Sequence, residues 1–135
     1  MEVINVERLL CEKDEWVGRT VSVTGWLVAT GDGNFITPPA RTEIEMGVLI
    51  DFPHFRDFAR GPLLLGGPLY NTPCQITGTI ANTPLAHQGM AIRDLTRGGI
   101  LYDVRGRPRL LEVDFDDEYR LKEIRRCAAE LAAIP

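Results

Sequence analysis

The chain lacks the features that mark several large classes of protein. None of its apolar runs approaches the roughly 20 residues that span a bilayer. It has two histidines and three widely separated cysteines (Cys11, Cys74 and Cys127), so we expect neither a zinc centre nor a disulfide framework. The 15 Lys and Arg are outnumbered by 19 Asp and Glu, which gives a formal net charge of −4 and a pI of about 5.2. This acidic balance argues against a protein whose main work is to neutralise phosphates.

What the chain does contain is typical of a folded globular protein. Hydrophobic residues make up 44% and charged residues 25% of the 135 positions, which is enough to bury a core. The length fits one domain, so residues 1–135 are predicted to form a single unit. The segment Met1–Asn5 lacks the basic region of a signal peptide, and the odd number of cysteines suits a reducing compartment. We therefore expect a cytoplasmic protein without a membrane partner or a cofactor.

The N-terminal part changes its apolar period from about 3.6 to 2. Asn5 can cap a helix over 6–15, and Trp16 is expected to pack this helix onto the rest of the protein. The alternation from Thr20 to Thr30 predicts a long strand, which Gly25 would bend near its middle. Similar patterns predict strands at 35–37, 43–50, 74–82, 90–95 and 100–103, a short helix at 54–60, and turns at 31–34 and 98–99.

The C-terminal part is predicted to be an irregular link followed by a helix. Residues 104–112 are basic and rich in turn formers, and the helix is expected at about 115–133 with Asp114 or Asp116 as its cap. Its apolar face would comprise Leu121, Ile124, Ala128 and Leu131. Between the third and fourth strands, Leu63–Leu65 lie in a segment rich in Gly and Pro. The sequence leaves open whether these leucines belong to the core or to an interface.

Two segments share one pattern. Val21-Ser-Val-Thr-Gly-Trp-Leu-Val-Ala-Thr30 aligns with Cys74-Gln-Ile-Thr-Gly-Thr-Ile-Ala-Asn-Thr83. Two copies are too few for a solenoid, which needs three or more repeats. The echo therefore predicts two strands with the same geometric role, each bent at its glycine around a barrel.

The order of elements and three segments carry a family resemblance. Residues 16–28 (WVGRTVSVTGWLV) resemble the first strand of tRNA-anticodon-type OB domains, Pro73–Ile80 the fourth, and Met90–Tyr102 the fifth. The resemblance covers about residues 16–103 and implies a mainly β fold: a five-stranded OB-like Greek-key barrel with a short N-terminal helix, a helix between strands 3 and 4, and an amphipathic C-terminal helix. The barrel region has few Lys, Arg or aromatic residues, which weakens the nucleic-acid binding that the resemblance also implies.

No pattern predicts catalysis or metal binding. The chain has no G-x-S-x-G and no P-loop, and the acidic residues at 114–118 are expected to cap a helix rather than hold a cation. All three cysteines are predicted to be buried structural thiols. An enzyme that acts through His54 or His87 is the least favoured alternative, so we expect a non-enzymatic protein.

Two binding hypotheses remain from the sequence. The first is an OB-like module for a protein partner, such as an adaptor or an immunity-type inhibitor that neutralises a toxin or an enzyme. The second is single-stranded DNA or RNA binding through the barrel face and residues 93–109, where five arginines oppose two aspartates. These arginines can equally pair with the acidic residues at 112–118. The candidate partner-binding residues are Trp26, Phe35, Arg41, His87, Arg93 and Arg97; for Trp26, burial in the core is the competing interpretation.

Overall fold

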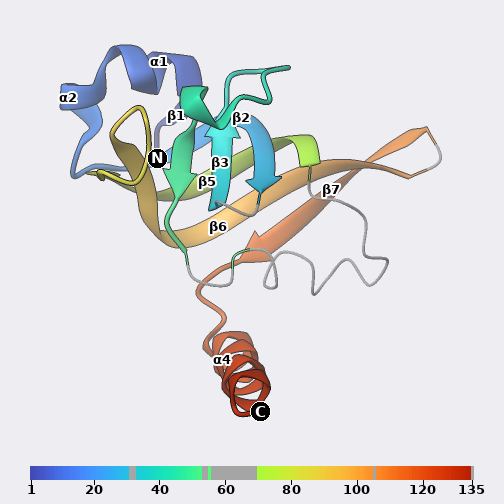
Figure 1. The fold of residues 1–135 in the computed structure, drawn as a ribbon. Helices are drawn as coiled ribbons and strands as arrows, with labels where there is room; N and C mark the ends of the chain where they lie inside the picture. The colour runs from blue at the N-terminus through green and yellow to red at the C-terminus, as the bar shows by residue number, and fades with distance from the viewer. Residues whose placement is uncertain (31–32, 53–54, 56–69, 105, 135) are drawn as a thin grey trace.

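The computed structural model is mainly β and describes residues 1–30, 33–52, 55, 70–104 and 106–134 (Figure 1). Its strands are β1 (Val3–Asn5), β2 (Thr20–Thr30), β3 (Gly33–Thr37), β4 (Val48–Ile50), β5 (Tyr70–Asn82), β6 (Met90–Val104) and β7 (Arg107–Asp114). Its helices are α1 (Val6–Cys11), α2 (Lys13–Trp16) and α4 (Glu118–Ala132), with a 3₁₀ turn, η1, at Ile44–Met46. The predicted helix at 54–60 and Leu63–Leu65 lie outside the described residues, apart from Phe55.

Five of the strands close into a barrel. Strand β2 pairs with β3, β3 with β4, β4 with β6, β6 with β5, and β5 returns to β2. All of these pairs are antiparallel except β4 and β6, which run parallel. The connectivity confirms the predicted five-stranded barrel and is consistent with an OB-like one. The remaining strands extend the sheet, because β1 pairs with β2 and β7 pairs with β6.

The two glycines of the repeated pattern lie where another segment approaches the backbone too closely for a side chain. A Cβ on Gly25 would lie 2.6 Å from Ile36 Cγ2 and 2.7 Å from the carbonyl oxygen of Thr37. A Cβ on Gly78 would lie 2.6 Å from the carbonyl oxygen of Arg93, and the register of β5 shifts between Thr77 and Thr79. Gly25 also falls between the half of β2 that pairs with β1 and the half that pairs with β3. The echo therefore marks two equivalent steric positions in the barrel.

The barrel interior is filled by alternate residues of the long strands. Val23 of β2 and Ile76 of β5 are fully buried cross-strand partners. Trp16 is also buried and packs the N-terminal helices against this core, as predicted. The guanidinium of Arg19 lies 4.5 Å from the centroid of the Trp16 ring. The indole Nε1 of Trp16 donates a hydrogen bond to Glu12 Oε2 at 3.3 Å. The face of the indole thus has a cation–π partner and its N–H has a hydrogen-bond acceptor.

The N-terminal prediction needs two corrections. The Asn5 side chain accepts a hydrogen bond from the Arg8 amide at 2.7 Å, so the predicted cap is confirmed. The helix, however, ends at Cys11, because the backbone of Glu12 is not helical (φ −118°, ψ 37°). A separate turn of helix, α2, follows. The strand β1 was not predicted, since its three residues pair only with distant residues of β2 and show no periodic pattern.

Three further predictions about the strands are wrong. Residues 43–50 contain η1 before β4, so the strand starts only at Val48. Gly98–Gly99 do not form a turn but lie within the 15-residue strand β6, where a Cβ on Gly98 would meet the Phe115 ring at 2.8 Å. Residues 104–112 are not an irregular link, because 107–112 belong to β7, which pairs with β6 along its whole length.

The C-terminal helix is anchored mainly at its start. The ring of Phe115 is buried and stacks on Phe55 with 5.5 Å between centroids, and its edge contacts Phe52 at 5.1 Å. Asp117, rather than Asp114 or Asp116, caps the helix by accepting from the Arg120 amide. Leu121 and Ile124 are half-buried against the core, as the predicted apolar face requires. Farther along the same predicted face, Leu131 is 69% exposed.

Candidate functional site

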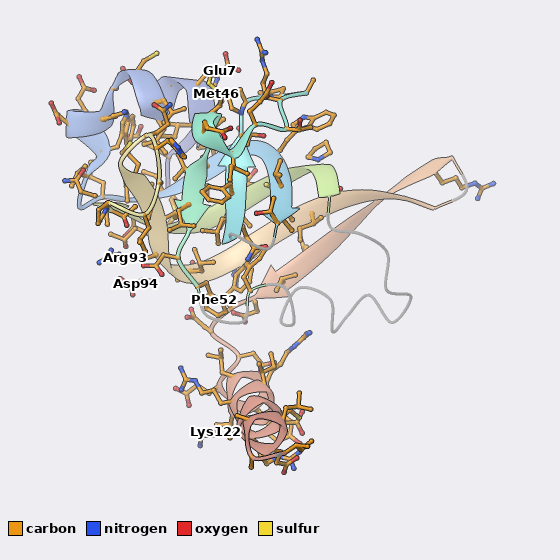
Figure 2. The ribbon with its side chains drawn as sticks, viewed as in Figure 1. Glu7, Met46, Phe52, Arg93, Asp94 and Lys122 are labelled. Carbon is orange, nitrogen blue, oxygen red and sulfur yellow. The ribbon has the colours of Figure 1, made fainter. Side chains whose placement is uncertain are left out.

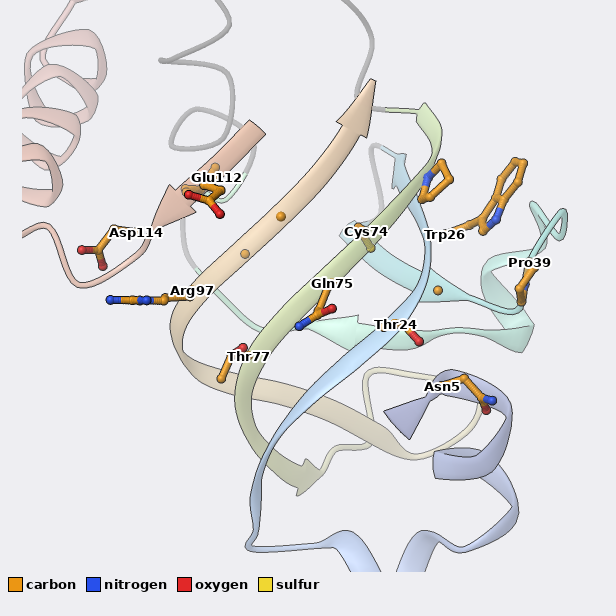
Figure 3. Close-up of a pocket in the computed structure, with 15 residues that line it drawn as sticks. Asn5, Thr24, Trp26, Pro39, Cys74, Gln75, Thr77, Arg97, Glu112 and Asp114 are labelled. Carbon is orange, nitrogen blue, oxygen red and sulfur yellow. The ribbon is translucent and has the colours of Figure 1, made fainter. Parts of the chain in front are cut away.

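An open groove of about 880 Å³ crosses the outer face of the sheet, over β2, β5, β6 and β7 (Figure 3). Cross-strand partners point to the same face of a sheet, so the pairing registers arrange its floor in rows. The pairing of four strands therefore forms the groove, and the sequence predicted the positions of two of them, β2 and β5. Asn5, at the end of β1, lies at its edge.

One row of cross-strand partners runs from Ser22 through Thr77 and Arg97 to Asp114, and the last three of these residues line the groove. The hydroxyls of Ser22 and Thr77 lie 2.6 Å apart and form a buried hydrogen bond. Arg97 and Asp114 are exposed. No carboxylate of the described residues lies within ion-pair distance of Arg97, although Asp114 is its cross-strand partner. The guanidinium of Arg97 is thus available to a ligand.

A second row runs from Thr24 through Gln75 and Gly99 to Glu112. Because Gly99 has no side chain, β6 contributes only backbone to the middle of this row. Gln75 and Glu112 are exposed, and neither side chain makes a hydrogen bond or an ion pair within the described part of the chain. The row therefore offers an amide and a carboxylate across an open floor.

The two ends of the groove differ in chemistry (Figure 3). At one end, the half-buried ring of Trp26 lies in register with Pro73, and Pro39 completes an apolar wall. At the other end, Glu112 and Asp114 project from alternate positions of β7. We call these the apolar end (Trp26, Pro39 and Pro73) and the acidic end (Glu112 and Asp114).

The thiols do not supply a nucleophile to the groove. Cys74 lines it but is buried, and burial raises the pKa of its thiol to about 12, so it stays protonated near neutral pH. Cys11 and Cys127 are exposed, so the prediction that all three thiols are buried is wrong for these two. Their helices turn these positions to solvent. Among the described residues, no three His, Cys, Asp or Glu side chains lie close enough together to hold a metal ion.

Of the six predicted partner-binding residues, the groove brings two together. Trp26 and Arg97 both line it, and Trp26 is partly exposed rather than lost in the core. Phe35 is only 4% exposed, so the expectation that its ring would be free to stack is wrong. The segment after η1 covers it, since a Cβ on Gly47 would lie 2.9 Å from Phe35 Cβ.

The other three predicted residues lie outside the groove. Arg41 is exposed and lies 4.0 Å from Glu43. Arg93, on the part of β6 away from the groove, pairs with Asp51 at 3.7 Å (Figure 2). His87 is exposed in the turns between β5 and β6. The arginines of 93–109 are therefore not one patch, since Arg93 is already paired on a different part of the surface.

Sequence reasoning missed the acidic end as part of a site. Glu112-Val113-Asp114-Phe115 alternates polar and apolar residues, which is a strand pattern. The structure bears out the pattern, because Val113 and Phe115 are buried while Glu112 and Asp114 are exposed. Asp114 is predicted as a helix cap, and only the pairing of β7 with β6 shows that Glu112 and Asp114 lie in rows with Gln75 and Arg97.

No protein-family model matches the chain, and no curated protein matches its sequence. Among the described residues, no helix is long and apolar enough to cross a membrane. The groove is therefore the observation from which a function can be argued.

Proposed function

We propose that this chain is a non-enzymatic, OB-like binding module that takes a protein partner in the groove. An adaptor, or an immunity-type protein that neutralises a toxin or an enzyme, suits such a module. The observation that carries the proposal is the mixed chemistry of the groove, which combines an apolar end, an amide and a guanidinium that have no side-chain partner among the described residues, and an acidic end. Protein interfaces combine aromatic and Arg anchors with a polar surround in this way.

Nucleic acid is the less supported ligand for the same barrel. The described lining of the groove has one cation, Arg97, and two carboxylates, Glu112 and Asp114, so its charge would repel phosphates. OB domains that bind oligonucleotides use the face of their second and third strands, which here are β3 and β4. On that face the expected stacking residue, Phe35, is buried.

A cytoplasmic location is part of the proposal. Cys11 and Cys127 are exposed free thiols, which persist where the compartment is reducing. This location also suits a partner that acts inside the cell.

Site-specific photo-crosslinking tests the proposal. A benzophenone amino acid replaces Gln75, which is exposed at the centre of the groove and makes no described side-chain hydrogen bond. The matched control carries the same group at Asn82, an exposed residue of the same strand about 23 Å farther along at 3.3 Å per residue. Both variants are expressed in the native cells and irradiated.

We expect a protein adduct from position 75 that position 82 does not give and that survives nuclease treatment. Adding Trp26→Ala should reduce its yield. An adduct that nuclease removes, one that forms equally from both positions, or no adduct from position 75 would overturn the proposal.

A further inference from the structure

We infer that the groove binds an extended peptide segment of its partner, one that carries an apolar side chain and, about five residues away, a Lys or Arg. The inference rests on the proposed function, because it names the kind of partner surface that the same groove would take. It follows from the separation of the two ends of the groove and from what lies between them.

The acidic end favours a basic side chain. Glu112 is exposed and has no cation within ion-pair distance among the described residues, and Asp114 lies two residues farther along β7 on the same face. Two carboxylates against one guanidinium leave this end with an excess negative charge. A Lys or Arg of the ligand would balance that charge, and Arg would also match the planar carboxylates.

The apolar end favours an apolar side chain. The half-buried ring of Trp26, with Pro73 in register beside it and Pro39 nearby, forms a wall that has no charged group (Figure 3). A large ring of this kind offers more contact area than any other residue of the groove, and tryptophan is a frequent binding anchor.

The distance between the ends sets the spacing within the ligand. Trp26 lies on β2 and Glu112 on β7, three strand spacings away through β5 and β6. Neighbouring strands are about 4.8 Å apart, and Glu112 is in register with Thr24, two residues from Trp26 along β2. The ends are therefore about 16 Å apart, which an extended chain covers in about five residues. The ligand would therefore run across the strands rather than add to their edge.

The floor between the ends is suited to a peptide backbone. The amide of Gln75 can both donate and accept, and the guanidinium of Arg97 donates; neither has a side-chain partner in the described part of the chain. Gly99 leaves the middle of the floor without a side chain, so a backbone can approach it. A strand crossing here would find partners for its otherwise unpaired carbonyl and amide groups.

A random decapeptide phage library, selected on the immobilised full chain, tests the inference. We expect enriched peptides to share an apolar residue followed or preceded by Lys or Arg at a separation of about four to six positions. A fluorescein-labelled synthetic copy of the most enriched peptide then gives dissociation constants by anisotropy.

Charge reversal provides the matched comparison. Glu112→Lys should weaken binding of this peptide by about tenfold or more, whereas Glu7→Lys, the same change on α1 outside the groove (Figure 2), should leave it within about twofold. Changing the peptide's basic residue to Glu should restore binding to Glu112→Lys. Trp26→Ala should weaken binding of either peptide. Circular dichroism confirms that each variant is folded.

The failures can be told apart. If photo-crosslinking at Gln75 captures a protein but the selected peptides lack a basic residue, or if Glu112→Lys and Glu7→Lys bind alike, the peptide chemistry is wrong while the proposed function stands. A library that enriches nothing on the wild-type chain overturns the inference as well. Absence of any adduct at Gln75 overturns the proposed function itself.

Discussion

The inner and outer faces of β2 and β5 are made from alternate residues of the same two strands. On the inner face, Val23 and Ile76 are fully buried and Gly78 has no room for a Cβ. On the outer face, Thr24 and Gln75 lie one position away from these residues and line an open groove. The pleat of a strand thus separates the packed core from the exposed groove over a single residue. Substitutions at neighbouring positions should therefore have opposite consequences, which the following experiments can sharpen or break.

The largest effect is expected at Gly78. A Cβ there would meet the Arg93 carbonyl oxygen at 2.6 Å, and Ile92 and Leu95 at 2.9 Å, so backbone as well as side chains would have to move. We expect Gly78→Ala to lower the free energy of unfolding by about 3 kcal/mol or more, measured by urea denaturation. The neighbouring Thr79→Ala removes only an exposed hydroxyl contact with Thr20 and should cost less than about 1 kcal/mol. Equal stability of the two variants would contradict the steric argument.

The next effect compares Ile76 with Gln75. Ile76→Ala leaves a cavity at a fully buried position and should lower the free energy of unfolding by about 2 to 4 kcal/mol. Gln75→Ala, on the outer face, should change it by less than about 0.5 kcal/mol but weaken partner binding. Thermal or urea denaturation measures the first quantity and the peptide anisotropy assay the second. A large loss of stability in Gln75→Ala would show that the outer face also holds the barrel together.

The buried thiol of Cys74, on the inner face of β5, should make the folding stability depend on pH. The thiol ionises near pH 9.0 when it is unfolded, and burial raises its pKa to about 12 in the folded protein. Above pH 9 the unfolded state therefore loses the proton that the folded state keeps, and folding stability falls as the pH rises. The loss should be about 2 kcal/mol between pH 9 and 11.

Cys74→Ala is the control for this pH dependence. It lacks the titrating thiol, so its stability should fall less than that of the wild type over the same pH range, in parallel urea titrations. Parallel curves for the two proteins would show that the Cys74 thiol is not protected by the core.

Much of the barrel could be predicted because its signals are local. The alternation of 20–30 and 74–82, and the Thr-Gly echo within them, predicted two bent strands, and the structure supplies a steric reason at both glycines. The Asn5 cap and the burial of Trp16 were also accessible from the sequence. Each of these signals is a pattern of neighbouring residues, although the atoms that crowd the two glycines belong to other strands.

The groove could not be predicted because it depends on pairing at long range. Arg97 faces Asp114, and Gln75 and Glu112 share a row, only through the registers of β5, β6 and β7. The arginines and turn formers at 104–109 predicted an irregular link where β7 begins. The Gly98–Gly99 pair predicted a turn, but β6 continues through it. The exposure of Phe35 was wrongly predicted for a related reason, since Gly47, which covers its side chain, follows twelve residues later in the chain. A local pattern shows that a residue lies in a strand but not what covers it.

The smallest effect is expected at a contact that does not fit the division into a buried inner face and an exposed outer face, because this outer-face contact is itself buried. The hydroxyls of Ser22 and Thr77 lie 2.6 Å apart, and these residues are only 5% and 9% exposed. Ser22→Ala leaves the Thr77 hydroxyl without this partner and should lower the free energy of unfolding by about 1 kcal/mol. The double variant Ser22→Ala/Thr77→Val removes both hydroxyls and should cost less than the sum of the two single changes, because no buried hydroxyl is left unpaired. A double-mutant cycle in urea measures the coupling. Strict additivity would mean that water replaces the lost hydroxyl, and the outer face would then be open to solvent even at Ser22.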